Sequence, residues 1–240
     1  MSGEFETAVI VAAGRATRLH PLTEQTPKCL LSVADESLIE RSLRLLRGVG
    51  IQRIAVIVGF EGGQVVARVG DRCVCIVNPF YALCNNLGSL WFARSFVAGA
   101  PFVYLHGDVI FEPEILARSL EGAQNRADDI LLVTDFGPVD EEAMKVRVSQ
   151  DGRLEEIGKH LALEEASGEW IGLTFVRATE RLFDTVEGRL LAGGHHEYDA
   201  AAFLRLAQEG ARVYCSSTFG RSWQEIDFVE DYDEAKRCFS

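Results

Sequence analysis

The sequence predicts a three-layer α/β fold with a mixed, mostly parallel central sheet. Short β-branched runs, such as residues 9–11 and 53–58, alternate along the chain with helical patterns such as residues 37–50. This strand–helix–strand order is typical of a parallel sheet with helices on both faces. The 240 residues suffice for one large α/β domain and no change of composition divides them, so we expect a single domain over residues 1–240.

The first half of the chain contains the clearest elements. Residues 9–11 read as a buried strand. Ser37 and Glu40 fit a capping box, in which each side chain accepts a hydrogen bond from a backbone amide at the start of a helix. We expect further elements in chain order: strand 53–58, helix 64–69, strand 73–77, a helix after Asn85 and Asn86, and strand 102–106.

The second half adds strands that are joined by shorter turns. Asp151 and Gly152 separate two alternating runs and predict a hairpin. Gly172 lies inside a strand pattern, where it indicates close approach of the backbone to another group. Thr179 is expected to cap a helix that ends near residue 186. The remaining predicted elements are strands 129–134, 145–149, 153–157 and 170–176, and helices 200–208 and 228–238.

The bulk composition excludes several classes of function. The formal net charge of −12 argues against a nucleic-acid partner, because surfaces that bind nucleic acid are generally basic. No apolar run approaches the roughly 20 residues of a membrane span, and the N-terminus is acidic where a signal peptide would be basic. The six cysteines lack the C-x-x-C spacing of metal sites. We therefore expect a cytoplasmic protein without membrane insertion.

The stretch after the first strand carries the strongest chemical signal. Ala12, Ala13 and Gly14 have minimal side chains, and Arg15 and Arg18 follow at once, with Lys28 beyond a turn. A small-residue backbone lets a ligand approach its amides closely, and fixed cations beside it suit a polyphosphate. The residues alone leave open an ordinary strand-to-loop turn with solvated arginines. In a chain of negative net charge, however, clustered cations favour an anion site.

The order of the residues in this stretch resembles a known family. Gly14-x-x-Thr17-Arg18-Leu19-x-Pro21-Leu22-Thr23, followed by Pro27-Lys28, is similar to the signature loop of the nucleoside-triphosphate transferases that activate sugar phosphates and phosphocholine. Ala16 stands where the family pattern has a second glycine. The resemblance implies the Rossmann-like fold of nucleotide-diphospho-sugar transferases, and catalytic roles for Arg18 and Lys28. It also implies nucleotide contacts from Ala12, Ala13, Gly14, Arg15, Ala16 and Thr17.

A second motif resembles one branch of this family. Asn85-Asn86-x-x-Ser89-Leu90 is similar to the CTP:phosphocholine and phosphonate cytidylyltransferases, which implies CTP as the nucleotide. An amide side chain offers both a donor and an acceptor, as the edge of a pyrimidine requires. Asn86 and Ser89 are therefore candidate contacts to the base or ribose, although one of the two asparagines also fits a helix cap.

Two aspartates far apart in the chain are candidate metal ligands. Asp108 follows the strand at 102–106, and Asp227 lies in Trp223-x-x-Ile226-Asp227-x-x-x-Asp231-Tyr232. Taken singly, Asp108 can begin a turn and Asp227 can cap the last helix. The family resemblance implies that both hold Mg²⁺, which needs only one or two protein carboxylates. Glu225, Glu230 and Asp231 read instead as solvated charges.

The acceptor-binding residues are predicted from the hairpin and from aromatic side chains. Lys159 follows the hairpin, where the resemblance implies contact with the acceptor phosphate, and Lys145 is the second candidate. Aromatic rings can bind a quaternary ammonium through cation–π contacts, and a nearby carboxylate adds attraction. Core packing remains the alternative for each ring. The candidates are Trp170, Tyr198 and Trp223, with Glu197 as the carboxylate.

These motifs together lead to one expected reaction. The resemblance implies Mg²⁺-dependent transfer of CMP from CTP to phosphocholine, 2-aminoethylphosphonate or another small phosphate or phosphonate, with release of pyrophosphate. A sugar-1-phosphate nucleotidyltransferase is the first alternative. A nucleotide-sensing domain of the same fold without turnover is the second, because a fold alone does not establish catalysis. A homodimer is left open beside a monomer.

Overall fold

The computed structural model of the chain describes residues 4–239. Residues 1–3, which begin the acidic N-terminus, and residue 240 lie outside this range, as do the two ends of the predicted 1–240 domain. A nine-stranded sheet has the main order β10-β9-β11-β6-β1-β4-β5, with β8 paired to β11 and β12 paired to β8. Its strands are β1 (Thr7–Ala12), β4 (Arg53–Val58), β5 (Val74–Val77), β6 (Phe102–His106), β8 (Ile130–Asp135), β9 (Lys145–Val148), β10 (Leu154–Ile157), β11 (Gly168–Val176) and β12 (Val213–Ser217).

The sheet has a parallel part and an antiparallel part. β4 and β6 flank β1 and run parallel to it, and β5 adds a further parallel strand beside β4. β11 then runs antiparallel to β6 and also pairs antiparallel with β8 and β9. β9 and β10 form the hairpin that the sequence predicted. The predicted α/β fold with a mixed sheet is confirmed.

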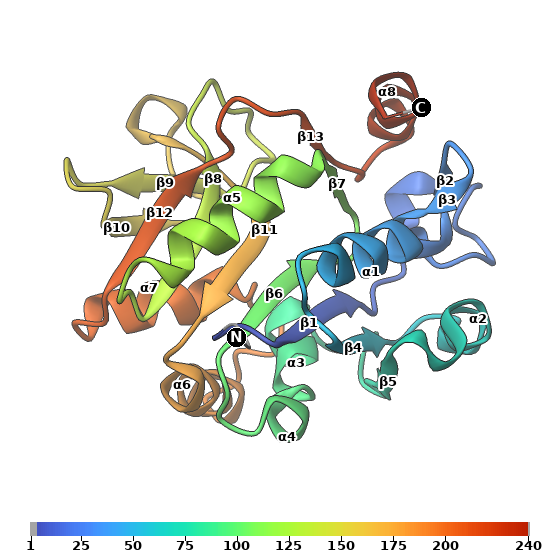
Figure 1. Cartoon of the computed structure of the whole chain (residues 1–240), viewed down its shortest axis with the longest axis horizontal. Coiled ribbons are helices and arrows are strands. Elements are labelled where there is room, and N and C mark those ends of the chain that lie inside the picture. The colour runs from blue at the N-terminus through green and yellow to red at the C-terminus, as the bar shows by residue number, and fades with distance from the viewer. Residues whose placement is uncertain (1–3, 240) are drawn as a thin grey trace.

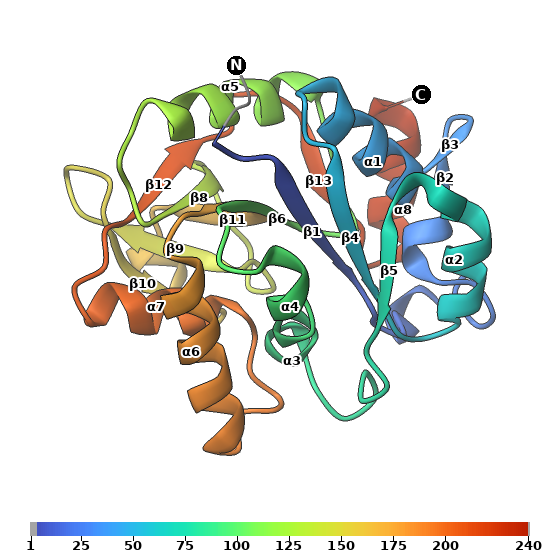
Figure 2. The same cartoon turned by 60° about the horizontal axis from the view of Figure 1, so that its bottom comes forward.

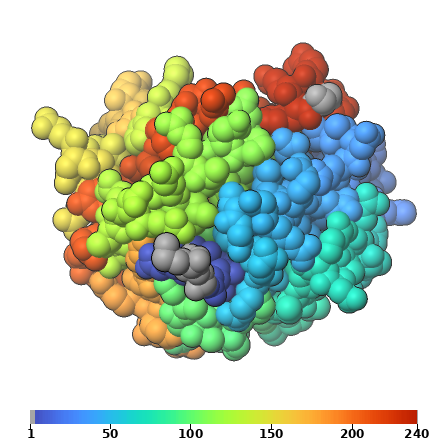
Figure 3. All heavy atoms as spheres, viewed as in Figure 1, coloured from blue at the N-terminus to red at the C-terminus, as the bar shows by residue number. Residues whose placement is uncertain are grey.

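Helices cover both faces of the sheet, because β1 is apolar on both of its faces (Figures 1 and 2). Ala8 and Ile10 belong to the core under α1 and α5, whereas Val9 and Val11 belong to the core under α3, α4, α6 and α7. Atoms of α1 and α5 close the first face (Figure 3). The helices are α1 (Leu38–Gly48), α2 (Gly62–Val69), α3 (Asn86–Trp91), α4 (Arg94–Val97), α5 (Pro113–Gln124), α6 (Thr179–Leu191), α7 (Ala200–Gln208) and α8 (Val229–Cys238).

The helix ends confirm one predicted cap and correct two. Ser37 and Glu40 form the expected capping box of α1. Thr179 is the first residue of α6 but does not cap it, because its hydroxyl donates to the carbonyl of Ala100. The helix α6 also extends to Leu191, beyond the predicted end at residue 186. Asp231 accepts from the backbone amides at the start of α8, so Asp227 does not serve as the cap.

A small two-stranded sheet joins distant parts of the chain. β7 (Val109–Phe111) pairs antiparallel with β13 (Trp223–Glu225). The amide of Ile226 then donates to the carbonyl of Asp108 at 3.0 Å, which places Asp227 beside the end of β6. The remaining short elements are β2 (Ser32–Val33), β3 (Glu36–Ser37) and 3₁₀ turns at Thr17–Leu19, Lys28–Leu30, Gly70–Arg72 and Leu163–Glu165.

Gly172 lies where the β11–β8 register shifts between Trp170 and Thr174. Its φ is +76°, and a Cβ at this position would lie 2.8 Å from the imidazole of His106. Both facts require glycine, because other residues rarely adopt this φ and no side chain would fit. The predicted close approach at Gly172 is confirmed. Among residues 4–239, no helix is both long enough and apolar enough to cross a membrane.

Candidate active site

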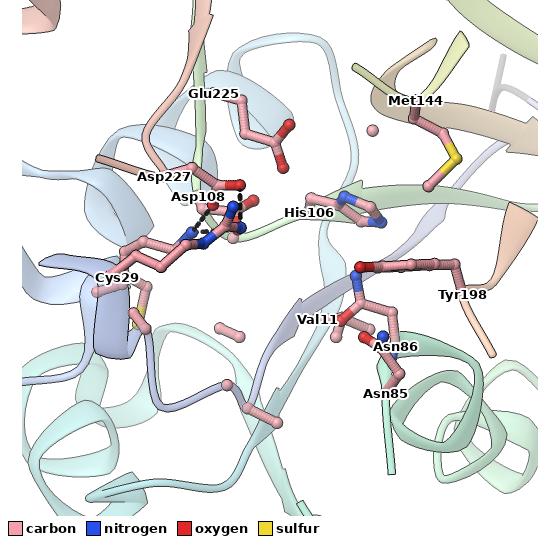
Figure 4. Close-up of a pocket in the computed structure, with 18 of the residues that line it drawn as sticks. Val11, Cys29, Asn85, Asn86, His106, Asp108, Met144, Tyr198, Glu225 and Asp227 are labelled. Carbon is pink, nitrogen blue, oxygen red and sulfur yellow. Dashed lines mark hydrogen bonds and ion pairs between the residues drawn. The ribbon is translucent and has the colours of Figure 1, made fainter. Parts of the chain in front are cut away.

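A cavity of about 310 Å³ opens at the carboxyl ends of β1 and β6 (Figure 4). Its walls come from the loop after β1, the end of β6, the segment before β9, the central part of β11 and the segment after β13. The cavity brings together most of the residues that the sequence singled out. They are Ala12, Ala13, Gly14, Ala16, Thr17, Arg18, Lys28, Asn86, Asp108, Lys159, Trp170, Tyr198 and Asp227.

The loop after β1 combines small residues with one strained position. Ala16 has φ 48° and ψ 48°, the left-handed region that glycine adopts most easily. An alanine there costs roughly 1–2 kcal/mol relative to a right-handed conformation. The hydroxyl of Thr23 donates to the carbonyl of Ala16 at 2.7 Å and helps to hold this conformation. The glycine of the family pattern is thus replaced without loss of the turn.

Lys28 joins the two predicted metal ligands. Its ammonium lies 2.8 Å from Oδ2 of Asp108 and 2.7 Å from Oδ1 of Asp227. Burial alone would lower the pKa of Lys28, but the two carboxylates outweigh it and raise the pKa above its usual value. Burial would likewise raise the pKa of Asp108, yet Lys28 holds it below its usual value. The lysine and Asp108 are therefore charged at neutral pH.

Arg18 links this buried group to the mouth of the cavity. Its guanidinium pairs with Asp227 through one nitrogen and with Glu142 through the other, the latter at 3.2 Å. Glu142 also lies 3.2 Å from the ammonium of Lys159, on the opposite side of the mouth. The ring of Phe228 supports the guanidinium at 4.8 Å. All three predicted catalytic cations thus line one cavity, and each is paired with a carboxylate.

Glu225 and His106 also line the cavity, and neither was predicted from the sequence as a site residue. Burial, followed by repulsion from Asp108 and Asp227, raises the pKa of Glu225 to about 8. Glu225 is thus not the solvated charge that we expected. Glu225 and His106 each precede a predicted metal ligand by two residues. They are the last residues of β13 and β6, and this nearness to the two aspartates along the chain is the signal that could have found them.

His106 is held in place by a buried network. Its Nε2 lies 2.7 Å from Oδ2 of Asp199, which also accepts from the hydroxyl of Tyr104. Burial alone would lower the pKa of His106, but Asp199 outweighs it and the pKa rises to about 9. Asp199 is fully buried and also accepts from the amide of Ala200 at the start of α7. The network fixes the ring of His106 against Trp170, 4.9 Å away.

The carboxylates at the inner end of the cavity fit a divalent cation. Ligand atoms of His106, Asp108 and Glu225 lie within 4.8 Å of one another. Oδ1 of Asp108 is buried and, among the described residues, has no hydrogen-bond partner. A buried oxygen without a partner is costly unless another group binds it. Carboxylate oxygens are the ligands that Mg²⁺ prefers, and Oδ1 of Asp108 is the oxygen here that no described side chain binds, whereas Lys28 and Arg18 bind the two oxygens of Asp227.

The opposite end of the cavity is formed by aromatic and amide side chains. Tyr198 is 41% exposed, and its ring lies 5.7 Å from the ammonium of Lys159. Trp170 is 2% exposed, and its indole nitrogen donates to the backbone and side chain of its own strand. Asn85 caps α3 by accepting from the amide of Asn86, which settles the alternative between the two. Both asparagines line the cavity (Figure 4).

Three of the predicted contacts are corrected because the side chains are bound elsewhere. Arg15 lies over the ring of Phe60, 5.7 Å from its centre, and does not line the cavity. Ser89 is buried on α3 and accepts from the amide of Asn78 at 3.0 Å. The buried ammonium of Lys145 donates to backbone carbonyls of the preceding segment rather than to the cavity.

The remaining two corrections concern the predicted acceptor pocket. Glu197 pairs with Arg189 at the end of α6 and lies outside the cavity. The indole nitrogen of Trp223 donates to Asp135 at 2.9 Å, and its ring packs against the core under α1 and α5. Only two of the three predicted aromatic residues, Trp170 and Tyr198, therefore line the cavity. These partners form in the tertiary structure and carry no sequence signal.

Comparison with known proteins agrees with this geometry. Residues 8–205 match the model of the MobA-like NTP transferase domain. The chain is 31% identical over 236 residues to a "Bifunctional IPC transferase and DIPP synthase" of Aquifex aeolicus, covering 97% of this chain and 51% of the relative. It is 30% identical over 258 residues to a "CMP-5'-(3-aminopropyl)phosphonate synthase" of Streptomyces rubellomurinus, covering 97% of this chain and 38% of the relative. The chain thus spans about half of the length of the first relative and 38% of the second.

A solved structure shows the same fold. The CTP:phosphocholine cytidylyltransferase from Streptococcus pneumoniae superimposes with a TM-score of 0.78 at 24% identity, covering 98% of this chain and 100% of the other. At this identity the likeness concerns the fold. The family match extends from β1 through most of α7, and so includes the small-residue loop, Lys28 and Asp108. The chain therefore belongs to the MobA-like NTP transferase family.

Proposed function

We propose that the chain is a cytidylyltransferase, which transfers CMP from CTP to a small phosphate or phosphonate and releases pyrophosphate. The observation that carries this proposal is the position of Lys28, clamped between Asp108 and Asp227 beside the small-residue loop. Lys159 lines the same cavity and can receive a second anion. The choice of reactants is supported by the names of two similar proteins, the CMP-5'-(3-aminopropyl)phosphonate synthase of Streptomyces rubellomurinus and the CTP:phosphocholine cytidylyltransferase of Streptococcus pneumoniae.

The nucleotide is held at the inner end of the cavity. Backbone amides of the loop after β1 face the triphosphate, and Arg18 and Lys28 supply positive charge to it. Asn86 is the candidate contact to the cytosine or ribose, because it lines the cavity whereas Ser89 does not. Fixed donors of this kind stabilise charge on the phosphoryl oxygens without reorganisation during the reaction.

The reaction itself needs no protein nucleophile. An oxygen of the acceptor phosphate or phosphonate attacks the α-phosphorus of CTP in line. The new bond joins that oxygen to phosphorus, and the bond from the α-phosphorus to the bridging oxygen of pyrophosphate breaks. The acceptor is already an anion at neutral pH, so no general base is required. The obstacle is repulsion between two anions, which Arg18, Lys28 and Lys159 reduce by position and charge.

Asp108, Asp227 and Glu225 are the residues that would hold Mg²⁺. The ion supplies neutralisation of phosphate charge when it is bound. Glu225 with its raised pKa is protonated in part at neutral pH, and a cation beside it would favour its ionised form. Lys28 binds Oδ2 of Asp108 and Oδ1 of Asp227, which leaves Oδ1 of Asp108 for the ion.

The acceptor is best tested among aminoalkylphosphonates first. A cage for a quaternary ammonium needs several exposed ring faces, and Trp223 lies outside the cavity while Trp170 is almost fully buried. Tyr198 alone of the three exposes much of its ring. We therefore place 2-aminoethylphosphonate before phosphocholine, and glucose 1-phosphate after both. The homodimer and the cytoplasmic location stay predictions.

The experiment is pyrophosphate release from CTP with each acceptor in turn, with Mg²⁺ and with EDTA. We expect release with a phosphonate or phosphocholine in Mg²⁺ and only background release in EDTA. Release with glucose 1-phosphate alone would favour the sugar-phosphate alternative. CTP binding without release for every acceptor would favour the nucleotide-sensing alternative and would contradict the proposal.

A further inference from the structure

Glu142 lies at the mouth of the cavity between two cations that come from distant parts of the chain. One carboxylate oxygen, Oε2, is 3.2 Å from Nη1 of Arg18 and 3.2 Å from Nζ of Lys159. Arg18 belongs to the loop after β1, and Lys159 follows the β9–β10 hairpin. The carboxylate thus bridges the two walls of the mouth, in the place where a phosphate oxygen would meet the same two donors.

The backbone that carries Glu142 is anchored, although its side chain is 63% exposed. Oδ1 of Asp140 accepts from the amides of Glu142 and Ala143, at 2.8 and 2.9 Å. The buried ammonium of Lys145 also donates to the carbonyl of Glu141 at 2.8 Å. A buried ammonium needs such partners, so this contact fixes the segment firmly. Lys145, predicted to bind the acceptor, instead positions the segment that presents Glu142.

We propose that Glu142 is a built-in counter-ion that competes with the phosphate groups of the substrates for Arg18 and Lys159. The inference rests on the proposed function, because that function supplies phosphate as the competing ligand. When a substrate binds, Arg18 and Lys159 must each release the carboxylate of Glu142 and bind a phosphate oxygen instead. The side chain of Glu142 is exposed and can turn into water at little cost, while Asp227 continues to hold Arg18.

Two properties of Glu142 support this role. The adjacent Lys159, followed by Arg18, lowers the pKa of Glu142, so the carboxylate is ionised at neutral pH. Its contacts are made entirely at the surface, where an ion pair contributes little to stability and is easily exchanged. Glu142 therefore sets how tightly the cavity binds anions, including the pyrophosphate product. Between turnovers it occupies Arg18 and Lys159, so that other anions do not bind to them.

The test compares Glu142→Gln with Glu141→Gln. Both substitutions remove one negative charge, but the side chain of Glu141 is exposed and does not line the cavity. Inorganic pyrophosphate is titrated into each protein by calorimetry at low salt and without divalent ions. We expect Glu142→Gln to bind pyrophosphate about two- to fivefold more tightly than the wild type, the range of an exposed ion pair. Glu141→Gln should bind it as the wild type does.

Equal or weaker binding of pyrophosphate by Glu142→Gln would overturn the inference, since a merely structural role predicts no gain. A second readout is steady-state kinetics, in which Glu142→Gln should lower KM for CTP more than it changes kcat. The binding measurement is independent of turnover. If Glu142→Gln gains affinity for pyrophosphate but the protein has no transferase activity, the inference stands and the proposed function is rejected. If the protein turns over but Glu142→Gln gains no affinity, the proposed function stands and the inference is rejected. If pyrophosphate bound none of the three proteins, the inference would fail, and the proposed function would be judged by the turnover assay in Mg²⁺ alone.

Discussion

The two ends of the cavity hold their charges in different ways. At the inner end Lys28, Asp108 and Asp227 have side chains only 14–24% exposed, and they extend from segments fixed by β6, β7 and β13. At the mouth Lys159 and Glu142 are 30% and 63% exposed, and both lie on connections between strands. The inner charges are thus enclosed and rigid, and the outer ones are open to water.

This difference indicates a division of work between the two ends. Charges removed from water interact strongly, because the effective dielectric constant falls, whereas exposed pairs are weakened by water and salt. A rigid, enclosed group can stabilise a transition state, while an open one mainly selects and releases ligands. We therefore expect substitutions at the inner end to lower turnover and those at the mouth to change substrate affinity.

The largest effect is expected for Lys28→Met. The variant removes the charge that joins Asp108 to Asp227 and faces the triphosphate, so kcat should fall about 10²–10³-fold, as for other electrostatic donors. Steady-state pyrophosphate release measures the change, and circular dichroism checks that the variant is folded. Turnover close to that of the wild type would remove Lys28 from the proposed mechanism.

The next effect concerns stability, and it arises at Glu169 on β11. Burial, followed by repulsion from Asp140, raises the pKa of Glu169 to about 7 from an ordinary value of 4.5. The unfolded chain therefore loses this proton at lower pH than the folded protein does, and the free energy of unfolding falls as pH rises from about 4.5 to 7. The loss is about 3 kcal/mol for a shift of this size.

Glu169→Gln should remove that contribution. Relative to the wild type, the variant should become more stable as the pH is raised from 4.5 to above 7. Urea unfolding of both proteins at several pH values gives the difference directly, and it cancels the other groups that titrate in this range. A difference that does not vary with pH would show that Glu169 ionises normally in the folded protein.

Lys159→Met tests the mouth of the cavity. Loss of a charged donor to the acceptor should lower kcat/KM for the acceptor about 10- to 100-fold, mainly through KM, because charged hydrogen bonds contribute about 1.5–3 kcal/mol. KM for CTP should change little. A fall in kcat equal to that of Lys28→Met, with KM unchanged, would break the proposed distinction between the two ends.

The smallest expected effect is on the strained turn after β1. Ala16→Gly should raise the free energy of unfolding by up to about 1 kcal/mol, since glycine adopts the left-handed region without a steric cost. Ala98→Gly is the matched control, because Ala98 has a similar positive φ but lies outside the cavity. Chemical denaturation should show a gain in both variants. A loss of stability in both would mean that unfolded-chain entropy outweighs the strain.

The same comparison explains how far the sequence could predict the site. The loop after β1 follows one strand directly, so its small residues and cations indicated an anion site, and the family resemblance then gave Arg18 and Lys28 their roles. Asp108 and Asp227 needed the family resemblance, because only the pairing of β7 with β13 brings them together. Glu225 and His106 could have been found from their position two residues before these aspartates, at the ends of β13 and β6.

The outer end could not be predicted to the same degree. The direction of Lys145 depends on how the β9–β10 hairpin meets the segment before it, and Trp223 finds Asp135 only in the folded chain. Glu142 lies in an irregular segment between β8 and β9, where no periodicity indicates which side chains point into a cavity. Strand and helix patterns therefore predicted the scaffold well and the connections that complete the site poorly.

The most direct test of the central claim is a single turnover of CTP labelled at the α-phosphorus, with the protein in excess over the nucleotide. In Mg²⁺ with 2-aminoethylphosphonate or phosphocholine, we predict that the label passes straight from CTP into a CMP-linked acceptor, while none becomes attached to the protein. Label that stays in CTP with every acceptor, or that appears on the protein before product, would contradict the meeting of two anionic reactants within this cavity.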